Sequence, residues 1–312
     1  MDIEGALDDY IEAENPSTEK GRRNRLRRWH EWWTETKGYD IPDDFSQTKF
    51  KKYRRHLRKE VNYTSATASQ HISTIRGFCK FIGEDEVWEN FDYAGLDRDS
   101  QKRKKLEFNY IEQHEFEQLL AECKGRNAFR NDLMLRVLWD TGVRVGEFCN
   151  ITLDDVNLAE GEIYIETLKG GKDRTVYLHQ FTKTRLREWI DEIRWTSKYA
   201  DESVYLFPTE RKPQMSRHSL ARVVEQVAED SGLQSVYHTS QQTGNEYHEI
   251  TPHTFRHSFA CLRVINDINI YKLQQLMGHR NVSTTEYYLG VKEQTLKEAN
   301  RASRPNYSKK YQ

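Results

Sequence analysis

The sequence predicts a mainly helical protein with a small β component, an α+β fold built from two domains. Apolar residues recur at three- and four-residue steps in long stretches, which is the spacing of one buried helix face. Alternation of apolar and polar residues, the pattern of a strand, appears in short stretches of the second half. The length of 312 residues is more than one small core fills and suits two domains.

The first predicted domain, residues 1–91, is helical. One expected helix has its apolar positions three or four residues apart, at Ile72, Ile75, Phe78, Cys79 and Ile82. A second expected helix carries Trp29, Trp32 and Trp33 among arginines. Aromatic residues at helical spacing are more often core than nucleic-acid contacts, so we interpret these tryptophans as core residues.

Basic residues are clustered, although the net charge of the chain is only -1. Residues 1–19 contain seven of the 49 acids and no Lys or Arg, so all 48 basic residues lie in residues 20–312. Residues 20–60 alone hold fourteen of them against six acids. Such clusters suit phosphate contacts, and an ordinary solvated helix face is the alternative. The candidate DNA-contacting residues are Arg22, Arg23, Arg25, Lys102, Arg103, Lys104 and Lys105.

The second domain, residues 108–290, is predicted to begin with helices and to continue with strands, after a basic linker at 92–107 that lacks apolar periodicity. The expected elements are helices at about 112–123 and 128–139, a hairpin of strands 162–167 and 175–178 with its turn at 170–171, a hairpin around 236–237 and 247–250 with its turn at 243–245, and helices at about 254–266, 270–277 and 283–289. Gly278 stands where a helix-ending glycine is expected.

Three segments of the second domain carry polar residues that packing alone does not explain. The first, residues 141–147, reads TGVRVGE and ends an apolar helix. The second, residues 251–257, reads TPHTFRH. The third, residues 276–279, reads LMGH and is followed nine residues later by Tyr288. None of the three is specific by itself, but their combination in this order is.

The order and spacing of these segments resemble the tyrosine recombinase, or phage integrase, family, including its Xer-type and archaeal integrase members. The resemblance covers residues 110–290. It implies a catalytic domain of helices and β-hairpins, preceded by a helical DNA-clamping (core-binding) domain that residues 1–91 match only by length, helicity and charge. It also implies that the basic tail, residues 291–312, is exchanged between subunits, with a disordered tail as the alternative.

The resemblance implies a catalytic role for five matched residues. They are Arg144 in the TGxR box, His253 and Arg256 in the HxxR box, His279 in the GH element and Tyr288 as the nucleophile.

A catalytic lysine is expected on the hairpin that follows the TGxR box. Lys169 fits this role best, and Lys172 at the same turn is its competitor. Leu168 stands where the family usually has a glycine before the lysine.

The chemistry of strand exchange explains these residue types. A covalent enzyme intermediate keeps the energy of the broken phosphodiester, so the strand can be rejoined without ATP. A tyrosine hydroxyl, with an ordinary pKa of about 10, becomes a good nucleophile only when its proton is drawn off or its phenolate is stabilised. Arg144 and Arg256 match the non-bridging phosphate oxygens, His279 adds a donor, His253 accepts the tyrosine proton and Lys169 protonates the leaving 5′ oxygen. The arginines take the place of a metal, so no metal and no cofactor is expected.

Several of these residues also have simpler interpretations. Arg144 and Glu147 have the spacing of a helix ion pair, and Glu147 is expected to support the site without reacting. His253 and His257 are four residues apart, but the zinc-protease pattern needs Glu where this chain has Thr254, so we interpret His257 as a packing or supporting residue. Tyr287 is expected to pack, because neighbours on a helix point about 100° apart.

The resemblance therefore implies a site-specific DNA recombinase that works through a 3′-phosphotyrosine, for integration or excision of a mobile element or for multimer resolution. Its expected partners are double-stranded DNA with a specific recombination site and three further copies of the chain, in a tetramer on DNA. A type IB topoisomerase and a catalytically idle DNA-binding protein are the alternatives. The filled catalytic positions count against the idle protein.

The expected location is the cytoplasm, with nucleoid association during the reaction and no membrane contact. The chain lacks an apolar run of about 18 residues, and its start lacks the features of a secretory signal. The cysteines form no CxxC pair and no metal-ligand spacing, so reduced core residues are expected at Cys79, Cys123, Cys149 and Cys261.

Overall fold

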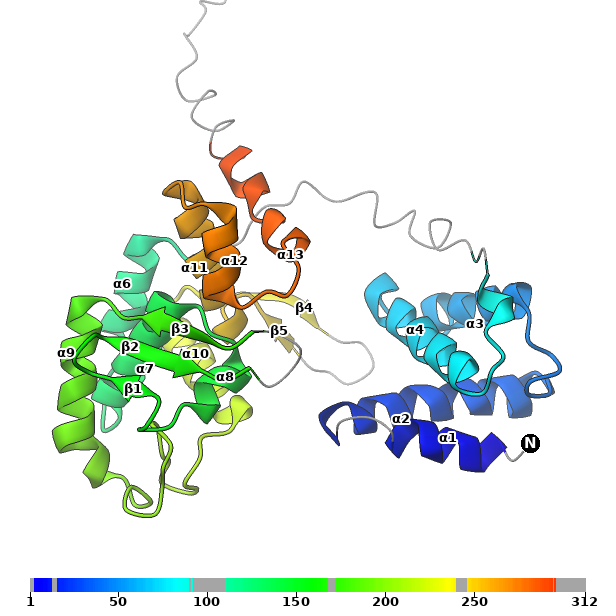
Figure 1. The fold of residues 1–312 in the computed structure, drawn as a ribbon, viewed down its shortest axis with the longest axis horizontal. Coiled ribbons are helices and arrows are strands. Elements are labelled where there is room, and N and C mark those ends of the chain that lie inside the picture. Colours follow the sequence, from blue (N-terminus) through cyan, green and yellow to red (C-terminus); the bar gives the residue numbers. More distant parts are fainter. Residues whose placement is uncertain are drawn as a thin grey trace, which may run out of the picture. The chain divides into compact units, whose positions relative to one another are not determined.

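The computed structural model describes residues 3–12, 16–89, 91, 110–167, 172–239, 246–293 and 295. The chain divides into two compact units, Met1–Lys105 and Leu106–Gln312, and the division falls within the segment expected to be a linker. The N-terminal unit is drawn in blue and cyan in Figure 1, and the C-terminal unit in green to red. Each unit has a hydrophobic core of its own.

The N-terminal unit is helical, as predicted. Its elements are α1 (Ile3–Glu12), α2 (Pro16–His30), the π-helical continuation η1 (Glu31–Thr36), α3 (Gln47–Lys59), α4 (Ser65–Phe81) and the 3₁₀ turn η2 (Glu86–Trp88). Ser46 and Thr64 cap α3 and α4, because their side-chain oxygens accept from backbone N–H groups three residues later. Trp29 and Trp33 are fully buried and Trp32 is 5% exposed, which confirms that the tryptophans are core residues.

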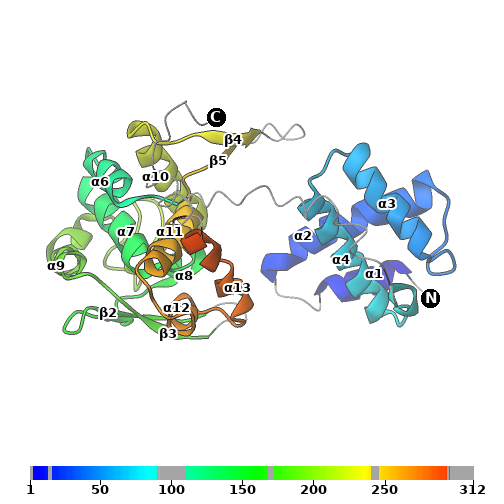
Figure 2. The ribbon, with the colours of Figure 1, turned by 90° about the horizontal axis from the view of Figure 1, so that it is seen from above.

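The C-terminal unit combines helices with two small antiparallel sheets. Its elements are α6 (Gln113–Ala121), α7 (Ala128–Thr141), α8 (Val145–Asn150), β1 (Val156–Asn157), β2 (Glu162–Ile165), β3 (Arg174–Tyr177), α9 (Gln180–Glu188), the π and 3₁₀ turns η4 (Trp189–Ile193) and η5 (Arg194–Thr196), α10 (Arg217–Asp230), β4 (Val236–Thr239), β5 (Glu246–His248), α11 (Pro252–Ile265), α12 (Ile270–Met277) and α13 (Ser283–Glu286). The first sheet has the order β1-β2-β3, and its strands β2 and β3 lie along the lower edge of the unit in the view of Figure 2. The mainly helical fold with a small β component is therefore confirmed.

The predicted elements differ from the structure mainly at their ends and in what was missed. The bounds of α12 agree with the prediction, and Gly278 ends that helix in the left-handed region, as expected. The helix expected at 283–289 is wrong in extent, because α13 ends at Glu286 and Tyr287 follows as a turn. Helices α9 and α10 were not predicted. The turns expected at 170–171 and 243–245 lie outside the described residues.

The cysteines are buried or half-buried. Cys79, Cys149 and Cys261 are buried, Cys123 is half-buried, and all four are free thiols. Burial raises the pKa of the Cys261 thiol to about 12, so it is protonated and unreactive at neutral pH.

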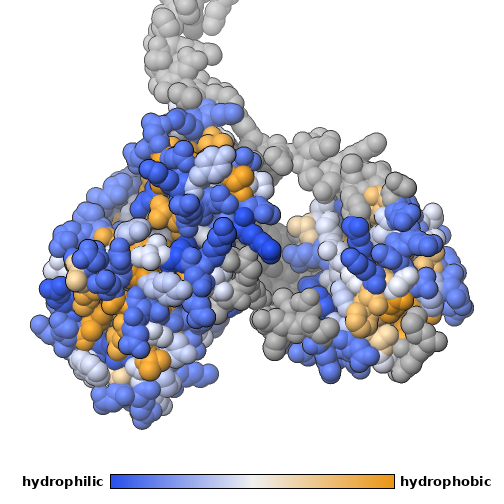
Figure 3. Space-filling model, in the orientation of Figure 1, coloured by the Kyte–Doolittle hydropathy of each residue, from blue (hydrophilic) through white to orange (hydrophobic). Residues whose placement is uncertain are grey.

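Both units expose a mostly hydrophilic face with small groups of apolar residues in the view of Figure 3. In the part of the chain that the structure describes, no helix has the length and apolar character needed to span a bilayer.

Candidate functional site

Two helices of the C-terminal unit end at glycines that allow close packing around one point. Gly142 follows α7 with φ +57°, and a Cβ there would lie 2.6 Å from the Phe259 ring. Gly278 follows α12 with φ +61°, and a Cβ there would lie 2.7 Å from Nη1 of Arg174. Both the positive φ and the lack of space require glycine at these positions.

Arg256 lies between these two helix ends. It stands on α11, whose start is set by the Thr251 capping box and by Pro252 in the first turn. Its Nη1 donates to the Gly142 carbonyl oxygen at 2.6 Å, and its Nη2 donates to the Met277 carbonyl oxygen at 2.6 Å. The side chain is buried, so these carbonyl groups fix the orientation of the guanidinium. Burial and the charge of Arg144 lower its pKa to about 9, which leaves it cationic at neutral pH.

Glu147 joins two more arginines to the site. Its carboxylate accepts from Nη1 of Arg144 at 2.7 Å and from Nη2 of Arg174 at 2.8 Å. Glu147 also accepts from the Arg144 backbone N–H, which closes the first turn of α8. Burial opposes ionisation of this carboxyl, but the hydrogen bonds and charges of Arg174 and Arg144 outweigh it and lower the pKa to about 2. Glu147 is therefore a buried carboxylate that orients two guanidinium groups.

Arg144 and Arg174 differ in what they leave available. The Arg174 side chain, at the start of β3, is 6% exposed and also donates from Nε to the Leu276 carbonyl oxygen at 2.7 Å. The Arg144 side chain is 40% exposed and has Glu147 as its recorded ion-pair partner. Of these two guanidinium groups, that of Arg144 is the one that a ligand in solution can reach. Arg174 is not apparent as a site residue from the sequence, because its burial depends on the pairing of β3 and not on a local motif.

His279 adds a neutral imidazole to the site. Nη2 of Arg256 lies 3.0 Å from His279 Nε2, and a guanidinium only donates hydrogen bonds, so Nε2 is the acceptor. The ring proton is then on Nδ1, which donates to Thr285 Oγ1 at 2.9 Å. Burial and the charges of Arg256 and Arg144 lower the His279 pKa to about 4, so the ring is neutral at pH 7 without an anion.

Tyr288 completes the site from the segment after α13. Its ring is 5% exposed, whereas Tyr287 is 42% exposed, so the two neighbours face opposite environments. The Tyr288 hydroxyl lies 3.1 Å from His257 Nδ1, and His257 packs edge-on against His253 at a centroid distance of 4.4 Å. Burial raises the Tyr288 pKa to about 12, while the charge of Arg256 acts in the opposite direction.

The structure thus brings five of the six candidate catalytic residues into one cluster. In addition to burial, the charges of Arg144 and Arg256 lower the pKa values of His253 and His279. The charge of Arg256 also favours the ionised form of Tyr288, against the effect of burial. Lys169 lies outside the described residues, whereas Lys172 is described and exposed. Within the described ranges, the cluster has three guanidinium groups against the carboxylate of Glu147, a balance that attracts anions.

The candidate DNA-contacting residues of the N-terminal unit are partly engaged with that unit itself. Arg22 donates to the Tyr10 carbonyl oxygen at 3.0 Å, and Arg25 donates to Thr74 Oγ1 at 2.8 Å. Arg23 forms exposed ion pairs with Asp8 and Glu19. The basic run at 102–105 lies outside the described residues.

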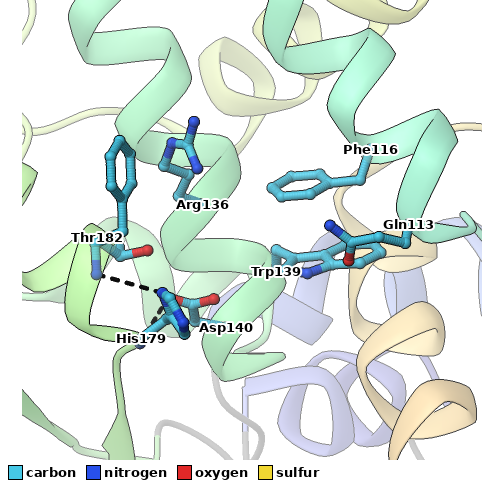
Figure 4. Close-up of a pocket in the computed structure, with 8 residues that line it drawn as sticks. Gln113, Phe116, Arg136, Trp139, Asp140, His179 and Thr182 are labelled. Carbon is cyan, nitrogen blue, oxygen red and sulfur yellow. Dashed lines mark hydrogen bonds between the residues drawn. The ribbon is translucent and has the colours of Figure 1, made fainter.

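A cavity of about 460 Å³ lies elsewhere in the C-terminal unit, between α6, α7 and the start of α9. Figure 4 shows Phe116 and Trp139 on one side of it, where their rings stack at a centroid distance of 4.1 Å. The Asp140 carboxylate accepts from the His179 backbone N–H at 2.9 Å. None of the five candidate catalytic residues that the structure describes lines this cavity. Within the described ranges, no group of three or more His, Cys, Asp or Glu side chains is placed to hold a metal ion.

The sequence matches a known family over the C-terminal unit. Residues 109–295 match the family described as the phage integrase family. The chain is 26% identical over 292 residues to the tyrosine recombinase XerA of Thermococcus kodakarensis, covering 93% of this chain and 90% of that protein. It is 30% identical over 251 residues to the tyrosine recombinase XerA of Pyrococcus horikoshii, covering 80% of this chain and 77% of that protein.

Solved structures share the fold. The XerH site-specific recombinase in a post-cleavage complex with a palindromic difH substrate matches with a TM-score of 0.68 and 20% identity, over 88% of this chain and 77% of that one. The Tn1549 transposon integrase in complex with transposon right end DNA matches with a TM-score of 0.70 and 16% identity, over 96% of this chain and 100% of that one. At these identities the likeness describes the fold and does not assign individual residues.

Proposed function

The chain belongs to the phage integrase family, and we propose that it is a site-specific DNA recombinase that cuts and rejoins strands through a 3′-phosphotyrosine at Tyr288. One observation carries the assignment of the site. Arg144, Arg256, His279 and Tyr288 come from segments far apart in the sequence and lie in one cationic cluster. The relatives are named as recombinases, which favours recombination over the relaxation of supercoils by a type IB topoisomerase.

In the cleavage step, the Tyr288 oxygen forms a bond to the phosphorus while the bond from phosphorus to the 5′ oxygen breaks. The phenol proton passes to an imidazole of α11, with His253 as the acceptor expected from the sequence, and the 5′ oxygen takes up a proton to become a free hydroxyl. Arg144 and Arg256 stabilise the charge that develops on the non-bridging oxygens. Lys169 is the proposed donor to the 5′ oxygen, with Lys172 as the alternative. Attack by the 5′ hydroxyl of a partner strand reverses these steps and releases the tyrosine.

Phosphate binding should raise the pKa of His279 and so allow this histidine to donate a hydrogen bond. Burial and the charges of Arg256, Arg144 and Arg174 lower the His279 pKa to about 4 when no anion is present. A phosphate supplies the missing negative charge and competes with His279 Nε2 for the Arg256 guanidinium. Both effects raise the pKa of His279, which then can donate to a phosphate oxygen.

The proposed partner is double-stranded DNA with a specific recombination site, bound by a tetramer of this chain in the cytoplasm, at the nucleoid. The solved relatives in complex with DNA support the DNA partner. The DNA-clamping role of the N-terminal unit and the exchange of the tail at 291–312 between subunits are parts of the same proposal.

The test is to trap the enzyme on a nicked suicide substrate and to map the peptide bonded to DNA. Wild-type protein should form a covalent adduct through Tyr288. Tyr288→Phe should abolish the adduct, since phenylalanine has no hydroxyl to attack the phosphorus, whereas Tyr287→Phe should keep it. An adduct that survives in Tyr288→Phe would assign the nucleophile to another residue.

A further inference from the structure

We propose that His257 is a positioning residue that aims the Tyr288 hydroxyl by accepting its hydrogen bond at Nδ1. The inference rests on the proposed function and adds a residue to its machinery. The sequence analysis interpreted His257 as packing or supporting and gave the tyrosine proton to His253. In the structure, the ring nitrogen at 3.1 Å from the Tyr288 oxygen belongs to His257.

Helix α11 places His257 well for this task. Residues His253 and His257 are one turn apart and lie on the same face of α11, with their rings in edge-on contact at 4.4 Å. His257 is half-buried and His253 is exposed, so His257 is the one that faces the buried Tyr288 ring. Its ring centroid lies 5.6 Å from that of Tyr288.

The protonation of the pair decides which group donates. Burial and the nearby His253 and Arg256 lower the His257 pKa to about 4, so the imidazole is neutral at pH 7. Burial raises the Tyr288 pKa to about 12, so the phenol keeps its proton. Tyr288 therefore donates, and His257 Nδ1 accepts with its own proton on Nε2.

This hydrogen bond directs the oxygen that reacts. A phenol proton lies close to the plane of its ring, so an acceptor at one place fixes the rotation of the hydroxyl. The proton then points at His257, and the oxygen lone pairs point elsewhere, available to a phosphorus atom. Without the acceptor, the hydroxyl rotates and can donate to the phosphate itself, which turns the nucleophilic lone pairs away.

A pair of polar substitutions tests the acceptor. Asn has Oδ1 two bonds from Cβ, as His has Nδ1, whereas Gln has Oε1 one bond farther out. We expect His257→Asn to retain the cleavage rate within about fivefold, and His257→Gln and His257→Leu to lose about 10- to 100-fold. The rate is that of covalent adduct formation on the nicked substrate. His114→Gln, an exposed histidine of the same unit, is the matched control and should behave as wild type.

A second substrate separates nucleophile positioning from help to the leaving group. Replacing the bridging 5′ oxygen by sulfur gives a leaving group that needs no proton. The loss in His257→Gln should be as large on this substrate as on the normal one. DNA affinity and the melting temperature of His257→Gln, measured beside His257→Asn, identify a folding defect.

The outcomes separate this inference from the proposed function. Absence of any Tyr288 adduct in wild-type protein would remove the proposed function itself. With that adduct present, three results overturn the role of His257: an unchanged rate in His257→Gln, an equal loss in His257→Asn and His257→Gln, or a loss that disappears with the sulfur substrate. Retention by Asn together with loss by Gln on both substrates supports it.

Discussion

The two units of this protein bury different kinds of side chain. The core of the N-terminal unit is aromatic and apolar, and the buried polar residues in its described part are His71 and Thr74. The C-terminal unit has an apolar core too, but it also buries Glu147, Arg174 and Arg256. Among the described residues, three of the four buried Arg, Lys, Asp and Glu side chains thus lie at the candidate site, and the fourth, Arg194, donates to the Ala200 and Tyr205 carbonyl oxygens.

Burying these charges is costly unless each one has partners. The cost is offset because Glu147 binds two arginines, and because helix-end carbonyl oxygens accept from Arg256 and Arg174. The arrangement leaves a positive excess that an anion can neutralise. The C-terminal unit is thus built around an incomplete charge balance, whereas the N-terminal unit is built around packing.

The largest effect that follows from this comparison is expected at Glu147. Glu147→Gln removes the single carboxylate between Arg144 and Arg174 and leaves a buried guanidinium without its counter-charge. We expect a loss of about 3–5 kcal/mol in the unfolding free energy of the C-terminal unit. The measurement is urea-dependent thiol labelling of the full chain, with Cys79 reporting on the N-terminal unit and Cys149 and Cys261 on the C-terminal unit, since all three are buried.

The control for this substitution is Glu60→Gln, which breaks an exposed pair with His56 in the other unit. It should leave both labelling midpoints unchanged, because exposed ion pairs contribute little. A Glu147→Gln protein with the wild-type midpoint at Cys149 would show that the charge balance of the site does not stabilise the unit.

Acidification should lower the stability of the two units unequally, by a smaller amount than Glu147→Gln does. The pKa values of His257 and His279 are lowered to about 4, so below their ordinary value of 6.5 the unfolded chain binds protons that the folded chain does not. Stability is therefore lost as the pH falls from about 6.5 toward 4, by about 1 kcal/mol for each histidine at pH 5.5. His71 gives the N-terminal unit one such group, with a pKa of about 4.

We thus expect the C-terminal unit to lose at least twice as much stability as the N-terminal unit between pH 7.5 and 5.5, because burial and nearby arginines lower the pKa of His253 as well. Labelling with a pyridyl disulfide, which still reacts with thiols at acid pH, measures both midpoints in one sample. Equal losses would mean that His257 or His279 takes up its proton in the folded state without penalty.

Local chemistry made part of the site predictable from the sequence. Gly278 ends a helix because its φ of +61° and its contact with Arg174 leave no room for a side chain, and a glycine after a periodic segment signals such an end. The Thr251 capping box and Pro252 start α11 in the same way, and the position of Arg256 follows from that start. These features depend on residues within a few positions of one another.

The remaining features depend on contacts between distant segments. Arg174 is buried because β3 pairs with β2 and reaches α12, so no nearby residue announces its contact with Leu276. The choice of His257 over His253 as the partner of Tyr288 depends on how the turn after α13 packs on α11. Spacing within α11 could name both histidines as candidates, but it could not choose between them.

The smallest effects are expected from the arginines of the N-terminal unit, where two near neighbours should differ. Arg23 forms only exposed ion pairs, so Arg23→Ala should leave the Cys79 labelling midpoint unchanged. If Arg23 contacts a DNA phosphate, the same substitution should reduce the slope of log affinity against log salt by about one. Arg25 is half-buried and donates to Thr74, so Arg25→Ala should lower the Cys79 midpoint. An unchanged salt slope in Arg23→Ala would remove that residue from the proposed DNA-contacting surface, and the internal contact of Arg25 would then indicate that packing explains the arginines of α2 better than DNA binding does.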